Sequence, residues 1–396
     1  MNIEKLRKID FYLGAVLIVL LRPASIILGT ILRRNHDIVI RKQLVVTKIK
    51  GGGSLLLALP ALLSLRKKYP DKIFTLVTSA EVKPFAELMG VFDEFVIINI
   101  SNLFYAFVSS LSAVRKVWRA NGLINFEIHS KLTTAFSSLS CARNRFGFYH
   151  ETNSWQRDVI THLFFYNITS PVYINYNQVA LALGATILPY KEVADFFVKH
   201  NQLQTPPVDE QTDKVVLAPF CSDLGKEREF SAQHWTKIFE TKFKNKKPLL
   251  FIVGGKNDVE RASLLALHLK EALPDFKIIN RVGETTLRES AIIIKSAHEF
   301  LTIDSGLNHI SRLTGDVRIT SYWGPTDPST RLAPFPNLSE TVVYKKLFCS
   351  PCVHAVAFPP CKGNNICMKQ YVSEDLNQYS TGGWLIISDS ATPKNI

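Results

Sequence analysis

The sequence is poor in cysteine and has no repeated or low-complexity segment. Six cysteines in 396 residues are too few for a disulfide scaffold. The absence of a repeat excludes a solenoid. Hydrophobic residues make up 46% of the chain and charged residues only 20%, which excludes a disordered or collagen-like protein. At this length we expect two domains of similar size rather than one core.

Acidic residues are also scarce relative to basic ones. The 34 Asp and Glu residues face 47 Lys and Arg, leaving a net charge of +13. Such a surface favours anionic partners: nucleic acid, acidic lipid head groups or phosphate-bearing substrates. The chain has no strand motif that combines aromatic and basic residues, so we expect no nucleic-acid partner.

The longest apolar run lies near the N-terminus, at residues 11–32, and reads FYLGAVLIVLLRPASIILGTIL. It is long enough to cross a bilayer core of about 30 Å. However, Arg22 and Pro23 interrupt its middle, where an arginine is costly in lipid and a proline removes a helical hydrogen bond. The sequence therefore predicts two short apolar helices broken at Arg22, each too short to span the membrane.

Basic residues flank this run on both sides: Lys5, Arg7, Lys8, Arg33 and Arg34. Positive flanks favour the cytoplasmic side of a membrane. We therefore expect residues 1–40 to form a helical hairpin or an interfacial anchor on the cytoplasmic leaflet of a membrane. The alternatives are a signal peptide, although no A-x-A-like cleavage site follows Leu21, a single tilted span, and a helix buried in the core.

After residue 40, short β-branched runs alternate with helical patterns, which is typical of a parallel sheet covered on both faces. The first half predicts a helix over 55–70 and strands at 44–49, 72–79 and 94–100. A polar segment with two prolines at 200–213 is the best candidate for a linker. The pattern then restarts, with a helix over 286–297 and strands at 214–220, 248–255, 276–283, 298–304 and 317–324.

We therefore expect a first domain at 41–203, a second domain at 204–376 and a C-terminal tail at 377–396. Both domains have the pattern of a doubly wound parallel sheet, and two such domains imply a cleft between them. In open sheets of this kind, ligands lie outside the carboxyl ends of the strands.

The sharpest local signal is TIDSGLNHI at 302–310, where a β-run ends at Asp304 and a helical pattern follows. The first backbone N–H groups of such a helix have no partner within it, so the turn is suited to phosphate. An ordinary strand-to-helix turn, capped by Asp304 or Ser305, is the alternative.

Two further loops follow strands in this half. SYWGPTDPSTRLAP (321–334) carries Thr326 and Asp327 in a short polar loop, and CSDLGKEREFSAQHW (221–235) carries Lys226 and Arg228. Such loops often contact a sugar or base, and paired cations can neutralise a diphosphate. Turn chemistry and chance pairing of basic residues explain the same features.

In the first half, three glycines and a serine stand between a strand and a helix, in KIKGGGSLLLALPAL (48–62). Glycines permit close approach of a ligand, and serine is a natural helix cap. The segment is neither a Walker loop nor a complete G-x-G-x-x-G fingerprint, so a dinucleotide-dependent reductase is not favoured. A flexible loop without a ligand is the alternative.

Four of the six cysteines cluster near the C-terminus: Cys349, Cys352, Cys361 and Cys367. Four thiolates are the number that a structural zinc site requires, with His354 as a spare ligand. The spacing after the first Cys-x-x-Cys is irregular for a zinc ribbon. A disulfide or redox pair and buried free thiols are the alternatives.

Taken in order, these segments resemble glycosyltransferase family 9, the heptosyltransferase family of bacterial lipopolysaccharide assembly. The resemblance runs from about Leu44 to Leu376. Its carriers are KIKGGGSLLLALPALLSLRKKYP, LAPFCSDLGKEREFSAQHW, RVGETTLRESAIIIKSAHEFLTIDSGLNH, YWGPTDPSTRLAP and the tail ending in CMKQYVSEDL. It implies a GT-B fold, an α/β architecture of two Rossmann-like doubly wound domains. The first would bind the acceptor, a lipid-linked saccharide, and the second a nucleotide-diphosphate sugar such as ADP-heptose.

The mechanism that the resemblance implies is inverting and independent of a metal or other cofactor. A base deprotonates an acceptor hydroxyl, and donors fixed around the diphosphate stabilise its growing charge. By position in the family's motifs, the donor-binding residues are Asp304, Ser305, Gly306, His309, Lys226 or Arg228, and the loop Gly324, Thr326 and Asp327. The acceptor loop falls on Gly51, Gly52 and Gly53.

One position departs from the family. The heptosyltransferases carry a Gly-Asp pair whose aspartate is the presumed base, whereas this chain has Gly53-Ser54. A serine hydroxyl is not a base near neutral pH. We therefore expect Glu127, in INFEIHSK (124–131), to replace it; a purely structural carboxylate is the alternative. The missing aspartate also leaves open a catalytically degenerate sugar-nucleotide-binding or scaffold protein.

Overall fold

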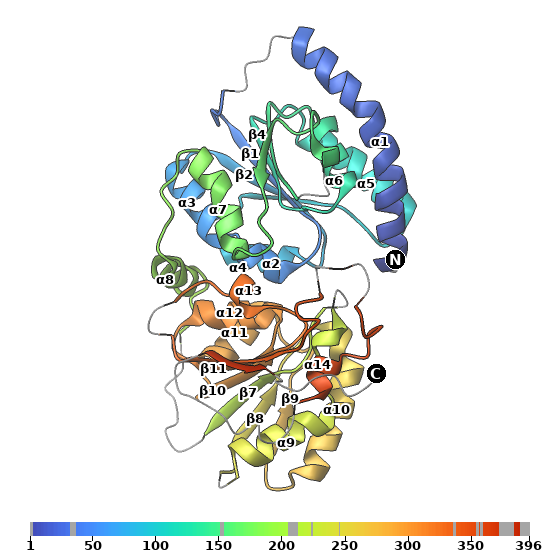
Figure 1. The fold of residues 1–396 in the computed structure, drawn as a ribbon. Coiled ribbons are helices and arrows are strands. Elements are labelled where there is room, and N and C mark those ends of the chain that lie inside the picture. Colours follow the sequence, from blue (N-terminus) through green and yellow to red (C-terminus); the bar gives the residue numbers. More distant parts are fainter. Residues whose placement is uncertain are drawn as a thin grey trace. The chain divides into compact units, whose positions relative to one another are not determined.

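The computed structural model describes residues 3–31, 37–150, 154–204, 213–222, 225–244, 246–335, 338–353, 356, 359–371 and 384–388. The chain divides into two compact units, residues 1–193 and 194–396. Each unit is built on one parallel sheet, which confirms the expected α/β fold (Figure 1).

The sheet of the first unit has the strand order β3-β2-β1-β4-β5-β6. Its strands are β1 (Gln43–Lys48), β2 (Ile73–Thr78), β3 (Glu94–Ile97), β4 (Gly122–Asn125), β5 (Asn144–Tyr149) and β6 (His162–Phe165). The central strand β1 pairs in parallel with β2 on one side and β4 on the other. All but the first of its residues are buried, as expected of a strand covered on both faces.

Helices cover both faces of this sheet. Figure 1 shows α5 and α6 on one face and α2, α3, α4 and α7 on the other. Their bounds are α2 (Gly52–Leu56), α3 (Leu59–Lys68), α4 (Lys83–Met89), α5 (Leu103–Lys116), α6 (Lys131–Leu139), α7 (Val172–Ala182) and α8 (Tyr190–His200). The helix predicted over 55–70 is in fact two. The chain turns at residues 57–58, and Pro60 stands in the first turn of α3, where its missing N–H costs nothing.

The N-terminal apolar segment is one helix, α1 (Ile3–Ile31), which continues through Pro23. The predicted break at Arg22 is therefore wrong. Contacts on both sides of the proline hold the helix against the first unit: Arg22 Nη2 donates to the carbonyl of Trp155 at 3.1 Å, and the hydroxyls of Ser25 and Ser138 lie 3.0 Å apart. Arg33 and Arg34 lie outside the described residues.

Helix α1 packs along α6, and Asp10 of α1 makes polar contacts with the start of that helix. The Asp10 carboxylate accepts hydrogen bonds from the backbone N–H groups of Lys131 and Leu132, both at 3.0 Å, and from the Ser130 hydroxyl at 2.6 Å. A side chain of α1 thereby caps the N-terminus of α6, where a negative charge is favourable. Further along, Ile18 is buried with Ala135 and Val159.

The sheet of the second unit has the order β13-β12-β11-β10-β7-β8-β9. Its strands are β7 (Lys214–Ala218), β8 (Leu249–Ile252), β9 (Lys277–Asn280), β10 (Glu299–Ile303), β11 (Arg318–Trp323), β12 (Glu340–Lys346) and β13 (Trp384–Ser388). The five strands predicted here are confirmed to within three residues at either end. Strand β13 lies in the segment expected to be a tail and pairs in parallel with β12.

The helices of the second unit are α9 (Ala232–Lys242), α10 (Val259–Ala272), α11 (Leu287–Lys295), α12 (Gly306–Thr314), α13 (Pro328–Arg331) and α14 (Ile366–Lys369). Helices α9, α10 and α14 lie on one face, and α11 and α12 on the other (Figure 1). Trp235, Phe239 and Tyr322 are fully buried in the core on the α9 side. The middle of the predicted linker, 205–212, is outside the described residues, and the two units meet in sequence within α8.

Candidate functional site

Both sheets have a topological switch point, and the predicted site residues gather at these two places. In the first sheet the chain moves outward from β1 through β2 to β3 and then returns to place β4 on the other side of β1. In the second sheet β7 and β10 are the corresponding neighbours. Loops leave adjacent strands in opposite directions there, which opens a crevice for ligands at the carboxyl end of the sheet.

In the second unit, the structure brings Arg228 and Asp304 together at this point. Arg228 follows β7 and Asp304 follows β10, and Nη1 of the arginine donates to Oδ2 of the aspartate at 3.1 Å. Both side chains are buried. Arg228 Nε also donates to the carbonyl of Gly225 at 3.0 Å. A buried guanidinium fixed in this way presents its remaining N–H groups in a set direction.

The ionisation states follow from this pairing. Burial raises the pKa of Asp304, but the positive charges around it, Arg228 foremost and then His309 and Arg331, outweigh burial and hold that pKa at about 2. Burial lowers the pKa of His309 to about 4, although the Asp304 charge opposes the shift. Near neutral pH, Asp304 is therefore an anion and the neighbouring His309 is a neutral imidazole.

Helix α12 begins directly after Asp304. Ser305 is its N-cap, and the Ser305 hydroxyl accepts from the backbone N–H of Asn308 at 3.4 Å; Gly306 is the first helical residue. The predicted turn is thus confirmed, with Ser305 as the cap. Asn308 is completely buried, and within the described residues neither atom of its amide has a hydrogen-bond partner. A buried unpaired amide is costly, so a ligand or water that reached it would be bound favourably.

The loop after β11 contributes Gly324, Thr326 and Asp327. Thr326 is buried, and its side chain interacts with the Asp304 carboxylate, which also helps to lower the pKa of that group. Asp327 caps α13, accepting from the Ser329 backbone N–H at 2.9 Å. A Cβ at Gly324 would lie 2.8 Å from the Met368 sulfur and 3.0 Å from the Cys367 sulfur, so any larger residue would displace these two side chains.

Lys226 does not join the buried pair. It lines a cavity of about 250 Å³ together with residues at and just before the starts of α9 and α14: Glu229, Phe230, Ser231, His234, Asn365, Met368 and Lys369. Of the two cations that the sequence offered for a diphosphate, Arg228 is the one beside Asp304.

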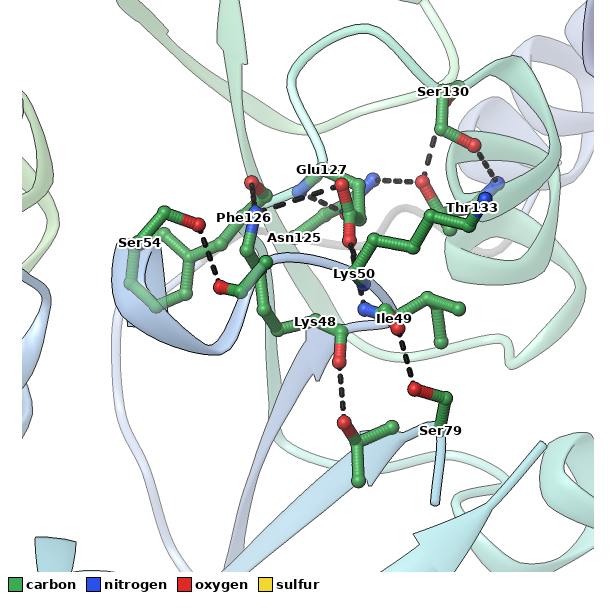
Figure 2. Close-up of polar contacts among 12 residues, drawn as sticks. Lys48, Ile49, Lys50, Ser54, Ser79, Asn125, Phe126, Glu127, Ser130 and Thr133 are labelled. Atoms are coloured by element: carbon green, nitrogen blue, oxygen red, sulfur yellow. Dashed lines mark hydrogen bonds and ion pairs between the residues drawn. The ribbon is translucent and has the colours of Figure 1, made fainter. Parts of the chain in front are cut away.

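In the first unit, Glu127 follows β4 and reaches the loop after β1 (Figure 2). Its Oε1 accepts from the backbone N–H groups of Ile49 at 2.7 Å and Lys50 at 2.8 Å. Its Oε2 lies 3.6 Å from Lys48 Nζ. The carboxylate therefore holds the β1–α2 loop in place with one oxygen and faces an ammonium group with the other.

The glycines that follow form a tight turn. Gly51 caps α2 in the left-handed conformation, with φ of 78°, where a side chain is unfavourable. A Cβ on Gly52 would lie 2.2 Å from the Phe85 ring. The Ser54 hydroxyl donates to the Gly51 carbonyl at 2.8 Å (Figure 2). Gly53, which precedes Ser54, lies within α2.

Three ionisable residues beside Glu127 were not predicted as part of the site: Lys48, Lys50 and His129. Burial, and then the charges of His150 and Lys48, lowers the pKa of His129. Burial also lowers the pKa of Lys50, against the opposing effect of Glu81 and Glu127. The only signal in the sequence was their position at the ends of predicted strands, which many structural residues share.

The four C-terminal cysteines lie near one another, but all are free thiols. Among the described residues, no group of three or more potential ligands is placed to hold a metal ion. His354 is outside that part of the chain. Burial, together with the neighbouring Cys352 and Cys349, raises the pKa of Cys367 to about 12, so it is a protonated core side chain. The predicted zinc site is therefore not supported.

Comparison with known proteins adds a family to this geometry. The family model described as glycosyltransferase family 9 (heptosyltransferase) matches residues 166–361, about half of the chain, including the Arg228–Asp304 pair. The chain belongs to glycosyltransferase family 9. Members of this family are generally metal-independent. No curated protein matches the chain.

Solved family 9 structures share the fold. A family 9 glycosyltransferase from Veillonella parvula is 20% identical, with 76% of this chain and 86% of that chain aligned at a TM-score of 0.57. E. coli ADP-heptose lipopolysaccharide heptosyltransferase II is 16% identical over 85% and 98% of the two chains, also at 0.57. E. coli heptosyltransferase WaaC, solved with ADP-2-deoxy-2-fluoro heptose, is 14% identical over 84% and 99%, again at 0.57. The GT-B fold expected from the sequence is thereby confirmed.

Proposed function

We propose that this family 9 protein is an inverting glycosyltransferase that moves a sugar from a nucleotide-diphosphate donor to a lipid-linked saccharide acceptor. Heptose carried by ADP is the donor that we favour, because the similar structures include E. coli heptosyltransferase WaaC with ADP and with ADP-2-deoxy-2-fluoro heptose. A lipopolysaccharide core or a related saccharide is the acceptor of matching chemistry.

The observation that carries this proposal is the buried Arg228–Asp304 pair beside the N-terminus of α12. During transfer, negative charge develops on the departing diphosphate. Asp304 fixes Arg228, whose free N–H groups, with the backbone N–H groups of Ser305 and Gly306, meet that charge. These donors are held before reaction, so they need no reorganisation in the transition state.

The other residues that we propose to contact the nucleotide sugar lie around the Arg228–Asp304 pair. The neutral His309 imidazole and the Thr326 hydroxyl donate to phosphate or ribose oxygens, and the close turn at Gly324 and Asp327 borders the nucleotide. Lys226, on the exposed side of the same loop, adds long-range attraction for an anionic donor.

In the first unit, the acceptor lies over Gly51, Gly52 and Gly53, and Glu127 acts as the base. Its Oε2 takes the proton from the acceptor hydroxyl, and the acceptor oxygen then bonds to the anomeric carbon of the donor sugar. The bond to the diphosphate oxygen breaks, and the electron pair leaves with the nucleotide. Because Oε1 is engaged by backbone N–H groups, Oε2 is the oxygen that serves as base.

The proposed place of action is the cytoplasmic face of an inner membrane. Within the described residues, Lys5–Ile31 is long and apolar enough to cross a membrane, which is weak evidence alone. Because one side of α1 packs on the first unit, we favour a helix lying in the interface plane over a span.

The test is to incubate the purified protein with a panel of nucleotide sugars and to measure binding and nucleotide release separately. Binding followed by release in the presence of a lipid-linked saccharide is the expected result. Binding without release of any nucleotide would instead identify a degenerate sugar-nucleotide-binding protein, the alternative that the Ser54 substitution favours. Absence of binding would contradict both.

A further inference from the structure

Helix α5 carries a row of large apolar side chains on its outer side. The exposed residues of this row are Leu103, Phe104, Phe107, Val108, Leu111 and, just after the helix, Trp118, with exposures between 46% and 70%. Their spacing places them on one side of a helix. The opposite side packs on the sheet, where Ala113 and Val117 are fully buried. A helix that is apolar on both sides is stable only when its outer side is also removed from water, by another protein surface or by lipid.

The row on α5 has a counterpart on α1. Ten apolar residues of α1 are at least half exposed: Phe11, Tyr12, Leu13, Val16, Val19, Leu20, Ile26, Ile27, Leu28 and Ile31. Both helices lie against α6 (Figure 1). More than half of the residues of α6 are themselves buried. Each helix therefore exposes a continuous group of apolar side chains, whereas an ordinary soluble surface exposes such side chains singly.

The charged residues beside these apolar side chains indicate which kind of partner contacts α1 and α5. Arg115, Lys116 and Arg119 are exposed at the end of α5, and residues 103–119 contain no acidic side chain. Lys5, Arg7 and Lys8 are exposed at the start of α1. The nearest acidic group described on α1, Asp10, is occupied in capping α6. An apolar surface with a cationic edge complements anionic lipid head groups over acyl chains.

A second copy of the chain fits less well. In a two-fold dimer a surface meets itself, and because residues 103–119 contain no acidic side chain, the row on α5 of the second copy would offer the cations of the first no acidic partner. We propose that α5 is a second membrane-contacting helix, which together with α1 lays the first unit on an anionic bilayer. This contact does not depend on which sugar is transferred, or on whether any is.

The first test compares full-length variants in binding to vesicles of phosphatidylcholine with and without phosphatidylglycerol. Phe104→Ser/Phe107→Ser should lower the partition coefficient at least about tenfold, because two exposed aromatic rings no longer enter the bilayer. The matched control is Leu264→Ser/Leu267→Ser on α10, two leucines of similar exposure in the second unit, which should leave partitioning unchanged. Arg115→Gln/Lys116→Gln should reduce mainly the dependence on phosphatidylglycerol.

The second test uses Trp118 and does not depend on how tightly α1 anchors the protein. Lipids brominated near the head group should quench a component of the fluorescence that disappears in Trp118→Phe. Unchanged partitioning of the Phe104/Phe107 variant, or absence of Trp118 quenching on bound protein, would overturn the proposal. So would a Phe104→Ser/Phe107→Ser variant that turns a dimer into a monomer in solution, because a second copy would then be the cover.

Discussion

Nη1 of Arg228 lies 3.1 Å from Oδ2 of Asp304, although the two residues are 76 positions apart in the sequence. The chain places them together because β7 and β10 are neighbours in the second sheet. In the first unit, Glu127 likewise accepts a hydrogen bond from the backbone N–H of a residue distant in the sequence, Lys50, because β1 and β4 are neighbours in the first sheet. In both units the contact joins the loops that follow the two strands of a switch point, and it fixes the site before a ligand arrives.

The first prediction concerns the buried pair. Arg228→Gln leaves the Asp304 anion buried without its partner, so the free energy of unfolding should fall by about 3–5 kcal/mol and donor binding should be lost. Denaturant titration and calorimetry with a nucleotide sugar measure the two effects. The control is Arg228→Gln/Asp304→Asn, which should recover much of the stability without recovering binding. Full donor binding by either variant would contradict the assigned role.

The second prediction separates the base from the structural role of Glu127. A glutamine at 127 keeps an oxygen for the Ile49 and Lys50 N–H groups but is not a base. Glu127→Gln should therefore unfold near the wild-type temperature while turnover falls by about 10²–10⁴-fold. Glu127→Ala, as the comparison, should lose turnover and also about 1–3 kcal/mol of stability, since two backbone donors lose their acceptor. Retained turnover in the glutamine variant would leave Glu127 as a structural carboxylate.

The third prediction follows from the buried His309. Its pKa is about 4 in the folded protein and near 6.5 when unfolded, so below pH 6.5 the unfolded chain binds a proton that the folded one does not. Stability from this residue is thus present above pH 6.5 and is lost as the pH falls toward 4, by about 2 kcal/mol between pH 7 and 4.5. Urea unfolding at several pH values should show this loss, and it should be smaller in His309→Gln. An identical pH profile in the variant would refute it.

The fourth prediction uses two glycines of α1. A Cβ at Gly14 would lie 2.5 Å from the Lys131 Cβ, while the position at Gly29 is open. Gly14→Ala should therefore push α1 away from α6 and lower the free energy of unfolding by about 1–3 kcal/mol. Gly29→Ala should be neutral or slightly stabilising, because alanine favours a helix. Faster hydrogen exchange in α6 of the first variant alone is the expected readout; equal behaviour of the two would refute the packing.

Local pattern was sufficient for most of the fold. β-branched runs such as 214–220 and 298–304 predicted buried strands because a parallel sheet covered on both faces needs continuous apolar residues. The turn at Asp304 was predictable for the same reason, since a strand end, a cap and a helical pattern are all short-range signals. Local pattern failed at Pro23, where the sequence favours a break and packing of α1 against the first unit keeps the helix continuous.

The sequence by itself determined the two parallel sheets, the strand-to-helix turns and the candidate residues at strand ends, because each of these depends on neighbours within a few positions. Only the tertiary structure decided that Arg228 rather than Lys226 pairs with Asp304, that Glu127 holds the loop after β1, and that the C-terminal cysteines are free thiols. These outcomes depend on which strands become neighbours in the sheet and on which side chains are removed from water, and neither is encoded in local spacing.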